Sequence, residues 1–252
     1  MPKFFVTSDI HSYYDELLVA LNEAGFDPNN KDHWLVSGGD EMDRGPNPIG
    51  VMKFLSSLTR KIILRGNHTQ LFEDLCGRGY PQWHDHSNGT VGTVEALGNY
   101  AQDMEFDLCC ERALNKTEQF RENMVNYFET KNYIFVHSWI PTKRNNYPYR
   151  IFEYDPDWRN ASQYKWDDAM WGNPYKMAGD GLNQTGKTIV FGHWHCSTGW
   201  AQAEGRSEFG DDAKFEPYYG DGFISIDACT AHSGKVNVIV IEDEFLDGDS
   251  NE

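Results

Sequence analysis

Five short runs of apolar, β-branched or aromatic residues each lead directly into polar residues of the kind that bind metal ions. This pattern of hydrophobic and polar positions predicts five buried strands with chemistry at their ends. The runs, with the polar residues that follow them, are 4–6 (Asp9, His11), 34–36 (Asp40), 62–64 (Asn67, His68), 133–136 (His137) and 189–191 (His193, His195). If the strands lie side by side, their carboxyl ends meet at one sheet edge, where ligands bind in open α/β folds.

Helical patterns fill the stretches between the first three runs. Ser12 and Asp15 match a capping box ahead of Leu17 and Leu21, and Pro48 is placed to be the first residue of a second helix. The first third of the chain is therefore predicted to be β-α-β-α-β, and the fold class to be α/β.

The remainder is interpreted as part of one domain over residues 1–242 with two inserted segments. Residues 80–130 and 140–185 are rich in Trp, Tyr, Asn, Asp, Gly and Pro, with helical stretches around 93–128. We expect both segments to surround the site rather than to form separate domains.

The C-terminal part contains two further β-rich runs. Residues 223–227 and 236–241 are predicted to form a β-hairpin that turns near Ser233 and Gly234. The acidic tail that follows, residues 243–252, is expected to be disordered.

Charge and composition narrow the range of partners. The 252 residues carry 22 basic and 39 acidic side chains, a formal net charge of -17. Such a field repels phosphate backbones and anionic lipids, so we expect neither a nucleic-acid duplex nor a membrane as partner. No apolar run approaches the roughly 18 residues that span a bilayer, and charged Asp9 comes too early for a signal peptide. Five cysteines without a C-x-x-C pair indicate a reducing, cytoplasmic location.

The ligand-type side chains form a set that suits two divalent cations. Two cations about 3.5–4 Å apart need carboxylate and imidazole donors and one carboxylate that bridges them. Asp9 and His11 are separated by one residue, so in an extended chain they point to the same side and can share a cation. Asp40 is the natural bridge between the two cations. The remaining donors are Asn67, His137 and the pair His193 and His195.

Five motifs lie at these strand ends. In chain order they are D-I-H at 9–11, G-D-E-M-D-R-G at 39–45, R-G-N-H at 65–68, V-H at 136–137 and G-H at 192–193. Together they resemble the motifs of the calcineurin-like metallophosphoesterases, in particular the phosphoprotein phosphatase branch in its short bacterial and bacteriophage form. The resemblance spans residues 3 to about 242. It implies a β-sandwich flanked by helices, with a two-metal site at the carboxyl ends of the strands.

The resemblance also implies a role for each motif residue. Asp9, His11 and Asp40 would hold one cation, and Asp40, Asn67, His137 and His193 the other. His68 would be the general acid, oriented by Asp43, while Arg44 and Arg65 would bind phosphate oxygens. A hydroxide bridging the cations would attack phosphorus in line. We expect Mn, with Fe or Zn as alternatives, because mixed oxygen and nitrogen donors suit all three.

Two departures from the family pattern leave roles open. The Gly192-His193-Trp194-His195 stretch has the G-H-x-H form of the wider superfamily, so His195 either joins the first metal site or forms a hydrogen bond near it. Thr69 stands where the family commonly has glutamate after R-G-N-H, and no further phosphate-binding arginine is identified.

The predicted activity is metal-dependent hydrolysis of phosphomonoesters, with phosphoserine or phosphothreonine in proteins as the natural substrate. The partner is thus a phosphorylated protein or a small phosphorylated molecule, and the oligomeric state is left open. The alternatives are a symmetrical diadenosine tetraphosphatase, which shares the opening motifs, and a phosphodiesterase. Asp43 followed by Arg44 favours the protein phosphatase, since the tetraphosphatase version commonly lacks that aspartate.

Two other classes of function receive less support. Residues 181–188, G-L-N-Q-T-G-K-T, match the P-loop pattern of nucleotide triphosphatases. A working P-loop needs a strand before the loop and a helix after it, whereas here a β-branched run follows Lys187. A non-catalytic metal scaffold would lack a ligand or the proton donor, and all of them are present.

Overall fold

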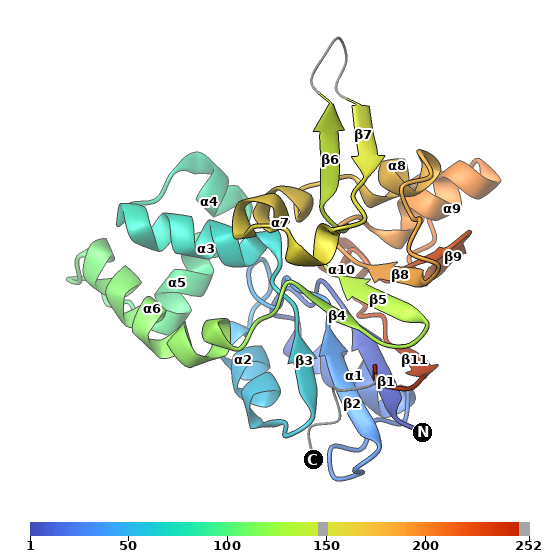
Figure 1. Ribbon diagram of the computed structural model, residues 1–252. Helices are drawn as coiled ribbons and strands as arrows, with labels where there is room; N and C mark the ends of the chain where they lie inside the picture. The colour runs from blue at the N-terminus through green and yellow to red at the C-terminus, as the bar shows by residue number, and fades with distance from the viewer. Residues whose placement is uncertain (146–150, 247–252) are drawn as a thin grey trace.

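Two mixed β-sheets form the centre of the computed structural model, which describes residues 1–145 and 151–246 (Figure 1). The first sheet has the order β11-β1-β2-β3, in which β1, β2 and β3 are parallel and β11 is antiparallel to β1. Its strands are β1 (Lys3–Thr7), β2 (His33–Ser37), β3 (Lys61–Ile63) and β11 (Ile239–Glu242).

The second sheet has the order β4-β5-β8-β10-β9, with β5, β8 and β10 parallel and an antiparallel strand at each edge. Its strands are β4 (Tyr127–Glu129), β5 (Tyr133–Val136), β8 (Thr188–Phe191), β9 (Tyr218–Gly220) and β10 (Phe223–Ser225). Each of the five runs predicted from the hydrophobic pattern falls on a strand of one of the two sheets.

A buried apolar layer joins the two sheets. Phe4, Val6 and Val36 of the first sheet pack in one cluster with Phe135 and Val190 of the second. Alternate residues of a strand point to opposite faces, so these positions line the inner faces of both sheets. The expected β-sandwich is therefore confirmed.

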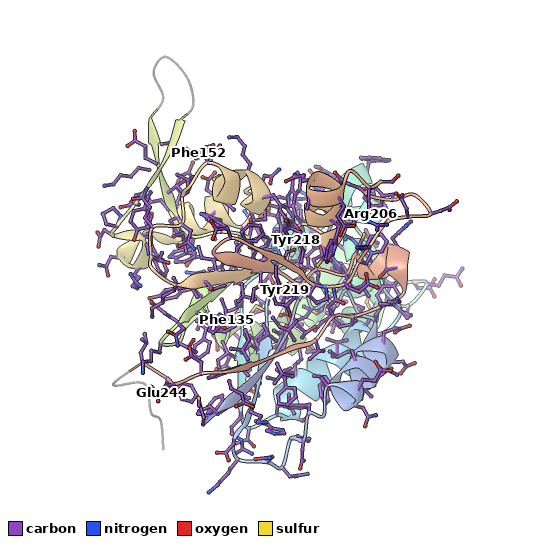
Figure 2. All side chains as sticks on the ribbon, turned by 90° about the vertical axis from the view of Figure 1, so that its right-hand side faces the viewer. Phe135, Phe152, Arg206, Tyr218, Tyr219 and Glu244 are labelled. Carbon is purple, nitrogen blue, oxygen red and sulfur yellow. The ribbon has the colours of Figure 1, made fainter. Side chains whose placement is uncertain are left out.

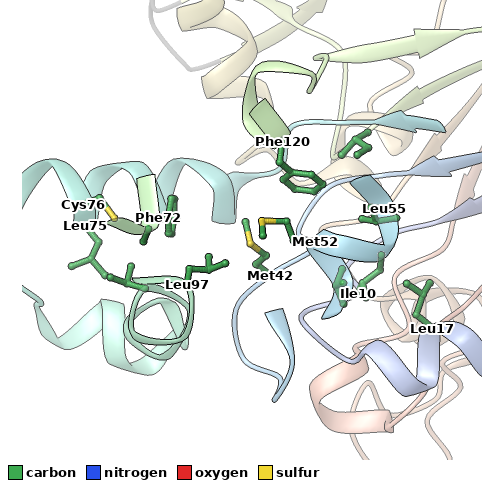
Figure 3. Close-up of a cluster of buried hydrophobic side chains, with 14 of the residues drawn as sticks. Ile10, Leu17, Met42, Met52, Leu55, Phe72, Leu75, Cys76, Leu97 and Phe120 are labelled. Atoms are coloured by element: carbon green, nitrogen blue, oxygen red, sulfur yellow. The ribbon is translucent and has the colours of Figure 1, made fainter. Parts of the chain in front are cut away.

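Helices cover the outer face of the first sheet. They are α1 (Tyr14–Glu23), α2 (Pro48–Ser57), α3 (Asn67–Arg78), α5 (Thr90–Gly98) and α6 (Phe106–Glu122). In the cluster beneath them, Met42 and Met52 lie between the Phe72 and Leu97 side chains on one side and Leu55 on the other (Figure 3). The unbranched thioether side chains fill the irregular space where α3 and α5 meet the sheet layer.

Of the two helix starts predicted from the sequence, the one at Pro48 is observed and the one with a capping box at Ser12 is not. Helix α2 begins at Pro48, and the side chain of Asn47 caps it by accepting a hydrogen bond from Gly50 N at 2.8 Å. The capping box predicted at Ser12 is wrong, because α1 begins after Tyr13 without a side-chain cap. Ser12 has a left-handed backbone (φ 65°) and belongs to the tight turn that follows β1.

The second sheet is covered by the inserted segment that follows β5. It contains the hairpin β6 (Thr142–Asn145) and β7 (Ile151–Tyr154), the 3-10 helix Trp158–Asn160, α7 (Gln163–Ala169) and α8 (Pro174–Gly179), and α9 (Cys196–Glu204) follows β8. The hairpin, which carries Phe152, projects from the body of the molecule in Figures 1 and 2. Trp139, Trp158 and Trp166 are buried in this layer, so these aromatic side chains pack the segment onto the sheet.

The predicted C-terminal hairpin is wrong. β10 pairs with β8 and β9 in the second sheet, whereas β11 pairs with β1 in the first, and the short helix α10 (Thr230–Ser233) lies between them. The start of the acidic tail is also ordered. Asp243 accepts a hydrogen bond from Asn132 N at 2.8 Å, and Phe245 packs edge-on against Phe4. Residues 247–252 lie outside the described residues.

Within residues 1–145 and 151–246, no helix combines the length and the apolar character that crossing a membrane requires. The small helix α4 (Trp83–Ser87) precedes α5 in the helical layer.

Candidate active site

Sharp turns after the strands bring the motif residues together. Among the described residues, nine other than glycine have a positive φ, and six of these belong to the predicted site: Asp9, His11, Asp40, Asp43, Arg44 and His193. Such a backbone is uncommon for residues with a side chain and costs roughly 1–3 kcal/mol each. Strain of this kind concentrates at functional sites, where the surrounding structure enforces it.

Two motif glycines permit the closest approaches. A Cβ added to Gly66 would lie 2.5 Å from the backbone nitrogen of Asp40 and closer still to its Oδ1. A Cβ on Gly192 would lie 2.7 Å from Ser8 Cβ and closer still to Oδ2 of Asp9. Real Cβ atoms essentially never approach other atoms so closely. The carboxylates of Asp40 and Asp9 therefore pack directly against the Cα atoms of Gly66 and Gly192, where no side chain would fit.

Four predicted ligands meet in one group. His137 Nε2 lies 2.8 Å from Asn67 Oδ1 and 3.4 Å from Asp40 Oδ2, and His193 Nδ1 lies 2.9 Å from the same Asn67 oxygen. His137 Nδ1 lies 2.8 Å from the carbonyl oxygen of Gly38. Because a carbonyl only accepts, Nδ1 carries a proton, and Nε2 faces the two oxygens. A bound cation would be attracted to the Asn67 and Asp40 oxygens that meet here.

A second group shares Asp40. Donor atoms of His11, Asp40 and His68 lie within 4.8 Å of one another, as do those of Asp40, His137 and His193. His11 Nε2 is 4.0 Å from Asp9 Oδ1, and its Nδ1 is fixed by the carbonyl oxygen of Met42 at 3.1 Å. Asp40 therefore lies where a bridging carboxylate is needed.

Burial sets the protonation of this site. Burial, followed by the neighbouring Arg44 and His68, lowers the pKa of His11 well below its ordinary value. Burial and the proximity of His137 likewise lower the pKa of His193 to about 3. Burial would raise the pKa of Asp40, but the surrounding histidines outweigh it and hold that pKa below its ordinary value. The neutral imidazoles of His11 and His193 beside the ionised Asp40 are in the state that binds a metal ion, so these residues fit the expected cations.

The predicted proton donor, His68, lies beside the predicted ligands. His68 Nδ1 is 2.7 Å from Asp43 Oδ2, and both side chains are buried. Burial would lower the pKa of His68, yet the carboxylates of Asp40 and Asp43 outweigh it and raise that pKa. The guanidinium of Arg44 lies between His11 and His68, with Nη1 2.9 Å from His11 Nε2 and Nη2 3.1 Å from His68 Nε2.

Arg65 and His195 have their described contacts elsewhere. Arg65 forms an ion pair with Glu73 and lies 4.0 Å from a carboxylate oxygen of Asp167. His195 Nδ1 lies 2.6 Å from Ser197 Oγ, and Nε2 lies 3.8 Å from Glu208. Neither belongs to the two ligand groups found among the described residues. Their roles as phosphate binder and metal ligand therefore stay predictions.

Asp227 is a buried carboxylate that the sequence analysis left unassigned. Its Oδ1 accepts a hydrogen bond from Cys229 N at 2.6 Å, and burial, followed by the charge of Asp9, raises its pKa well above the ordinary value. Next to it, Thr230 Oγ1 donates to the carbonyl oxygen of Asp9 at 2.9 Å. The signal was present in the sequence, since Asp227 follows an apolar run as the predicted ligands do.

The expectation that residues 181–188 do not form a working P-loop is confirmed. Residues 181–188 lie between α8 and β8, so a strand follows the loop where a helix is required. Lys187 Nζ pairs with Glu129 Oε1 at 2.8 Å and thus has a structural partner.

Comparisons with known proteins agree with this geometry. A symmetrical bis(5'-nucleosyl)-tetraphosphatase of Buchnera aphidicola subsp. Acyrthosiphon pisum is 39% identical over 69 residues, which are 27% of this chain and 24% of that protein. The asymmetrical bis(5'-nucleosyl)-tetraphosphatase PrpE of Bacillus velezensis is 33% identical over 89 residues, 31% of this chain and 36% of that protein. The chain thus matches about a quarter to a third of the length of these relatives.

Solved structures share the fold at low identity. A candidate diadenosine tetraphosphatase has a TM-score of 0.51 at 17% identity, covering 96% of this chain and 91% of its own. A cold-active protein-tyrosine phosphatase of the psychrophile Shewanella sp. has a TM-score of 0.50 at 16% identity, covering 96% and 76%. A sequence model of the calcineurin-like phosphoesterases matches residues 2–197. With buried ligands around Asp40 at the strand ends and a match over more than half of its length, this chain belongs to the calcineurin-like phosphoesterase family.

Proposed function

We propose that the protein hydrolyses phosphomonoesters with two divalent cations, and that its natural substrates are proteins phosphorylated on serine or threonine. The observation that carries the proposal is the pair of His68 and Asp43, 2.7 Å apart, directly beside the two ligand groups. An alkoxide leaves poorly without a proton, so an alkyl phosphomonoesterase needs a positioned acid of this kind.

The two ligand groups, which share Asp40, support the following proposed cation-binding residues. Asp9, His11 and Asp40 would hold one cation, with the second at Asp40 and the amide and imidazole donors. Those donors are Asn67, His137 and His193. When bound, such cations act as Lewis acids that neutralise phosphoryl oxygens and lower the pKa of water. We propose Mn²⁺ as the physiological ion.

The chain's own residues supply the other steps. The carboxylates of Asp40 and Asp43 raise the pKa of His68, which favours the doubly protonated ring that a general acid needs. In the structure Nε2 of His68 accepts from Arg44 Nη2 at 3.1 Å, so the acid form requires this guanidinium to turn from Nε2 to the phosphoryl oxygens of the substrate. The guanidinium of Arg44 offers two parallel donors, which suits the equatorial oxygens of a phosphoryl group.

An open groove supports a polypeptide substrate. It has a volume of about 840 Å³ and lies between the β6–β7 hairpin and α7 and α8, with Arg144, Tyr164 and Trp171 among its lining residues. Trp171 connects the groove to the site, because its ring centre is 6.4 Å from that of His193 and its Nε1 donates to Gln70 at 2.9 Å. A chain flanking the phosphorylated residue would lie along this groove.

A dinucleoside polyphosphate is the second candidate substrate. The relatives named above are bis(5'-nucleosyl)-tetraphosphatases, and Trp171, 47% exposed beside His193, offers a ring face on which a nucleobase could stack. This candidate uses the same cation-binding residues and differs only in the leaving group.

Phosphate release from three substrates tests the proposal. They are a phosphothreonine peptide, diadenosine tetraphosphate and an aryl phosphodiester, each measured with and without Mn²⁺, with Asp40→Asn as the control for metal dependence. Preference for the peptide would support the proposed function. Preference for either other substrate would replace it, and no turnover despite two bound cations would favour the non-catalytic scaffold.

A further inference from the structure

The first turn of α5 contacts the predicted proton-donor pair. Thr90 Oγ1 donates a hydrogen bond to Asp43 Oδ2 at 2.7 Å, the same oxygen that lies 2.7 Å from His68 Nδ1. Thr90 is 0% exposed and Asp43 1% exposed, so water does not compete for these bonds. The other oxygen, Asp43 Oδ1, has no hydrogen-bond partner among the described residues.

The backbone around Asp43 is held by residues 88–93, which comprise the two-residue link between α4 and α5 and the first turn of α5. Asp43 N donates to Thr93 Oγ1 at 3.1 Å. Gly89 presses against Arg44 so closely that an added Cβ would lie 2.7 Å from its Cα. Asp43 and Arg44 have φ angles of 74° and 60°, a backbone that residues with side chains adopt only when neighbours enforce it.

We propose that Thr90 is a positioning residue for the proton-transfer step and acts through Asp43 on His68. With both donors on Oδ2, the carboxylate cannot turn without breaking one of the two bonds. The carboxylate in turn fixes the plane of the His68 ring and the direction of Nε2. The proposal rests on the proposed function, because it assumes that His68 protonates the leaving group.

The step itself is a simple exchange of bonds. The nucleophile is a hydroxide, formed when water gives up one proton to solvent before the step; its oxygen forms a bond to phosphorus, and the bond from phosphorus to the leaving oxygen breaks. The leaving oxygen keeps that electron pair and takes the proton from His68 Nε2, so the ring becomes neutral while Nδ1–H stays bonded to Asp43. A substrate whose leaving group is already stable as an anion does not need this proton.

Thr90→Val tests the proposal, because valine keeps the shape of threonine and removes the donor. We expect kcat for a phosphothreonine peptide to fall about tenfold, the size expected for one buried hydrogen bond to a charged group, with KM unchanged. With 2,4-dinitrophenyl phosphate, kcat should stay within about twofold of the wild type, since that leaving group needs no acid. Thr90→Ser retains the hydroxyl and should restore most of the peptide activity.

A matched control separates positioning from packing. Thr130 is also 0% exposed, and its Oγ1 donates to Tyr133 O at 3.5 Å in the turn between β4 and β5, so Thr130→Val measures the cost of losing a buried threonine hydroxyl away from the site. Equal losses on both substrates in Thr90→Val, or no loss on either, would overturn the proposal.

His68→Asn distinguishes failure of this inference from failure of the proposed function. If His68→Asn affects only the peptide but Thr90→Val affects neither substrate, the role of Thr90 is wrong and the general acid stands. If His68→Asn affects both substrates equally, the assignment of the general acid fails, and the inference fails with it.

Discussion

Gly66 and Gly77 allow one substitution to be tested at two positions near the same helix. Gly66 immediately precedes α3 and lies against Asp40, whereas Gly77 is exposed in the last turns of α3 and an added Cβ there would meet nothing within 4 Å. Both backbones accept alanine, because neither has a positive φ. The two variants therefore differ mainly in what the new methyl group contacts.

The structure gives the size of each effect. In Gly66→Ala the Cβ would start 2.5 Å from Asp40 N, so Asp40 must move by roughly 1 Å, a displacement that can lower catalysis about 100-fold. The overpacking itself should cost about 1–3 kcal/mol of unfolding free energy. In Gly77→Ala the helix loses a flexible residue and should gain about 0.5–1 kcal/mol.

Three measurements decide the outcome. Thermal unfolding should give a lower Tm for Gly66→Ala and a higher one for Gly77→Ala, at about 2–4 °C per kcal/mol for a chain of this size. Calorimetric titration with Mn²⁺ should show weaker binding in Gly66→Ala alone, and kcat/KM for an aryl phosphate should fall only there. Wild-type metal affinity and activity in Gly66→Ala would refute the claim that the cation site needs bare backbone beside Asp40.

Three further variants test the site and the stability of the fold. Asp40→Asn should abolish Mn²⁺-dependent phosphate release and weaken Mn²⁺ binding by calorimetry; retained tight binding of two ions would contradict the bridging role. His68→Asn should keep the ions but lower turnover of a phosphothreonine peptide about 10²–10⁴-fold, while largely sparing 2,4-dinitrophenyl phosphate. Burial would raise the pKa of Glu129, but bonds from Arg159 and Lys187 outweigh it and lower that pKa. The ionised carboxylate of Glu129 therefore stabilises the fold at pH values above the ordinary pKa of glutamate. Glu129→Gln should lower the free energy of unfolding at pH 7. Urea titrations should show that the difference in unfolding free energy between the variant and the wild type shrinks below about pH 4. A pH-independent difference would mean that the charge of Glu129 is not its source.

The strand ends and the central ligands could be predicted because their signals are local. An apolar run that ends in Asp, Asn or His is visible within a few residues, and parallel strands bring such ends to one edge. The four residues that meet around Asn67 and the pair of His68 and Asp43 all follow this rule. The left-handed backbone at these positions also brings the side chains together, and it cannot be predicted from the sequence. Neighbouring segments enforce this conformation, which the residue types themselves disfavour.

What could not be predicted depends on partners far along the chain. The runs near 224 and 240 resemble a hairpin in isolation, but β11 finds its partner in β1, with Phe4 opposite Ile241. Thr90 lies 47 positions from Asp43 and no local pattern marks it. Arg65 shows the same limit, since its ion pair with Glu73 forms only once the chain turns into α3.

The pairing of β1 with β11 also affects how the protein can be made. During synthesis, one side of β1 has no partner until the chain has been extended through residue 242. At about 5–20 residues per second, this delay is on the order of 10 to 50 s. Throughout that time the nascent chain presents an open strand edge, the kind of surface on which other chains aggregate. Chaperone capacity and translation speed should therefore affect the yield of this protein more than the stability of the finished fold does.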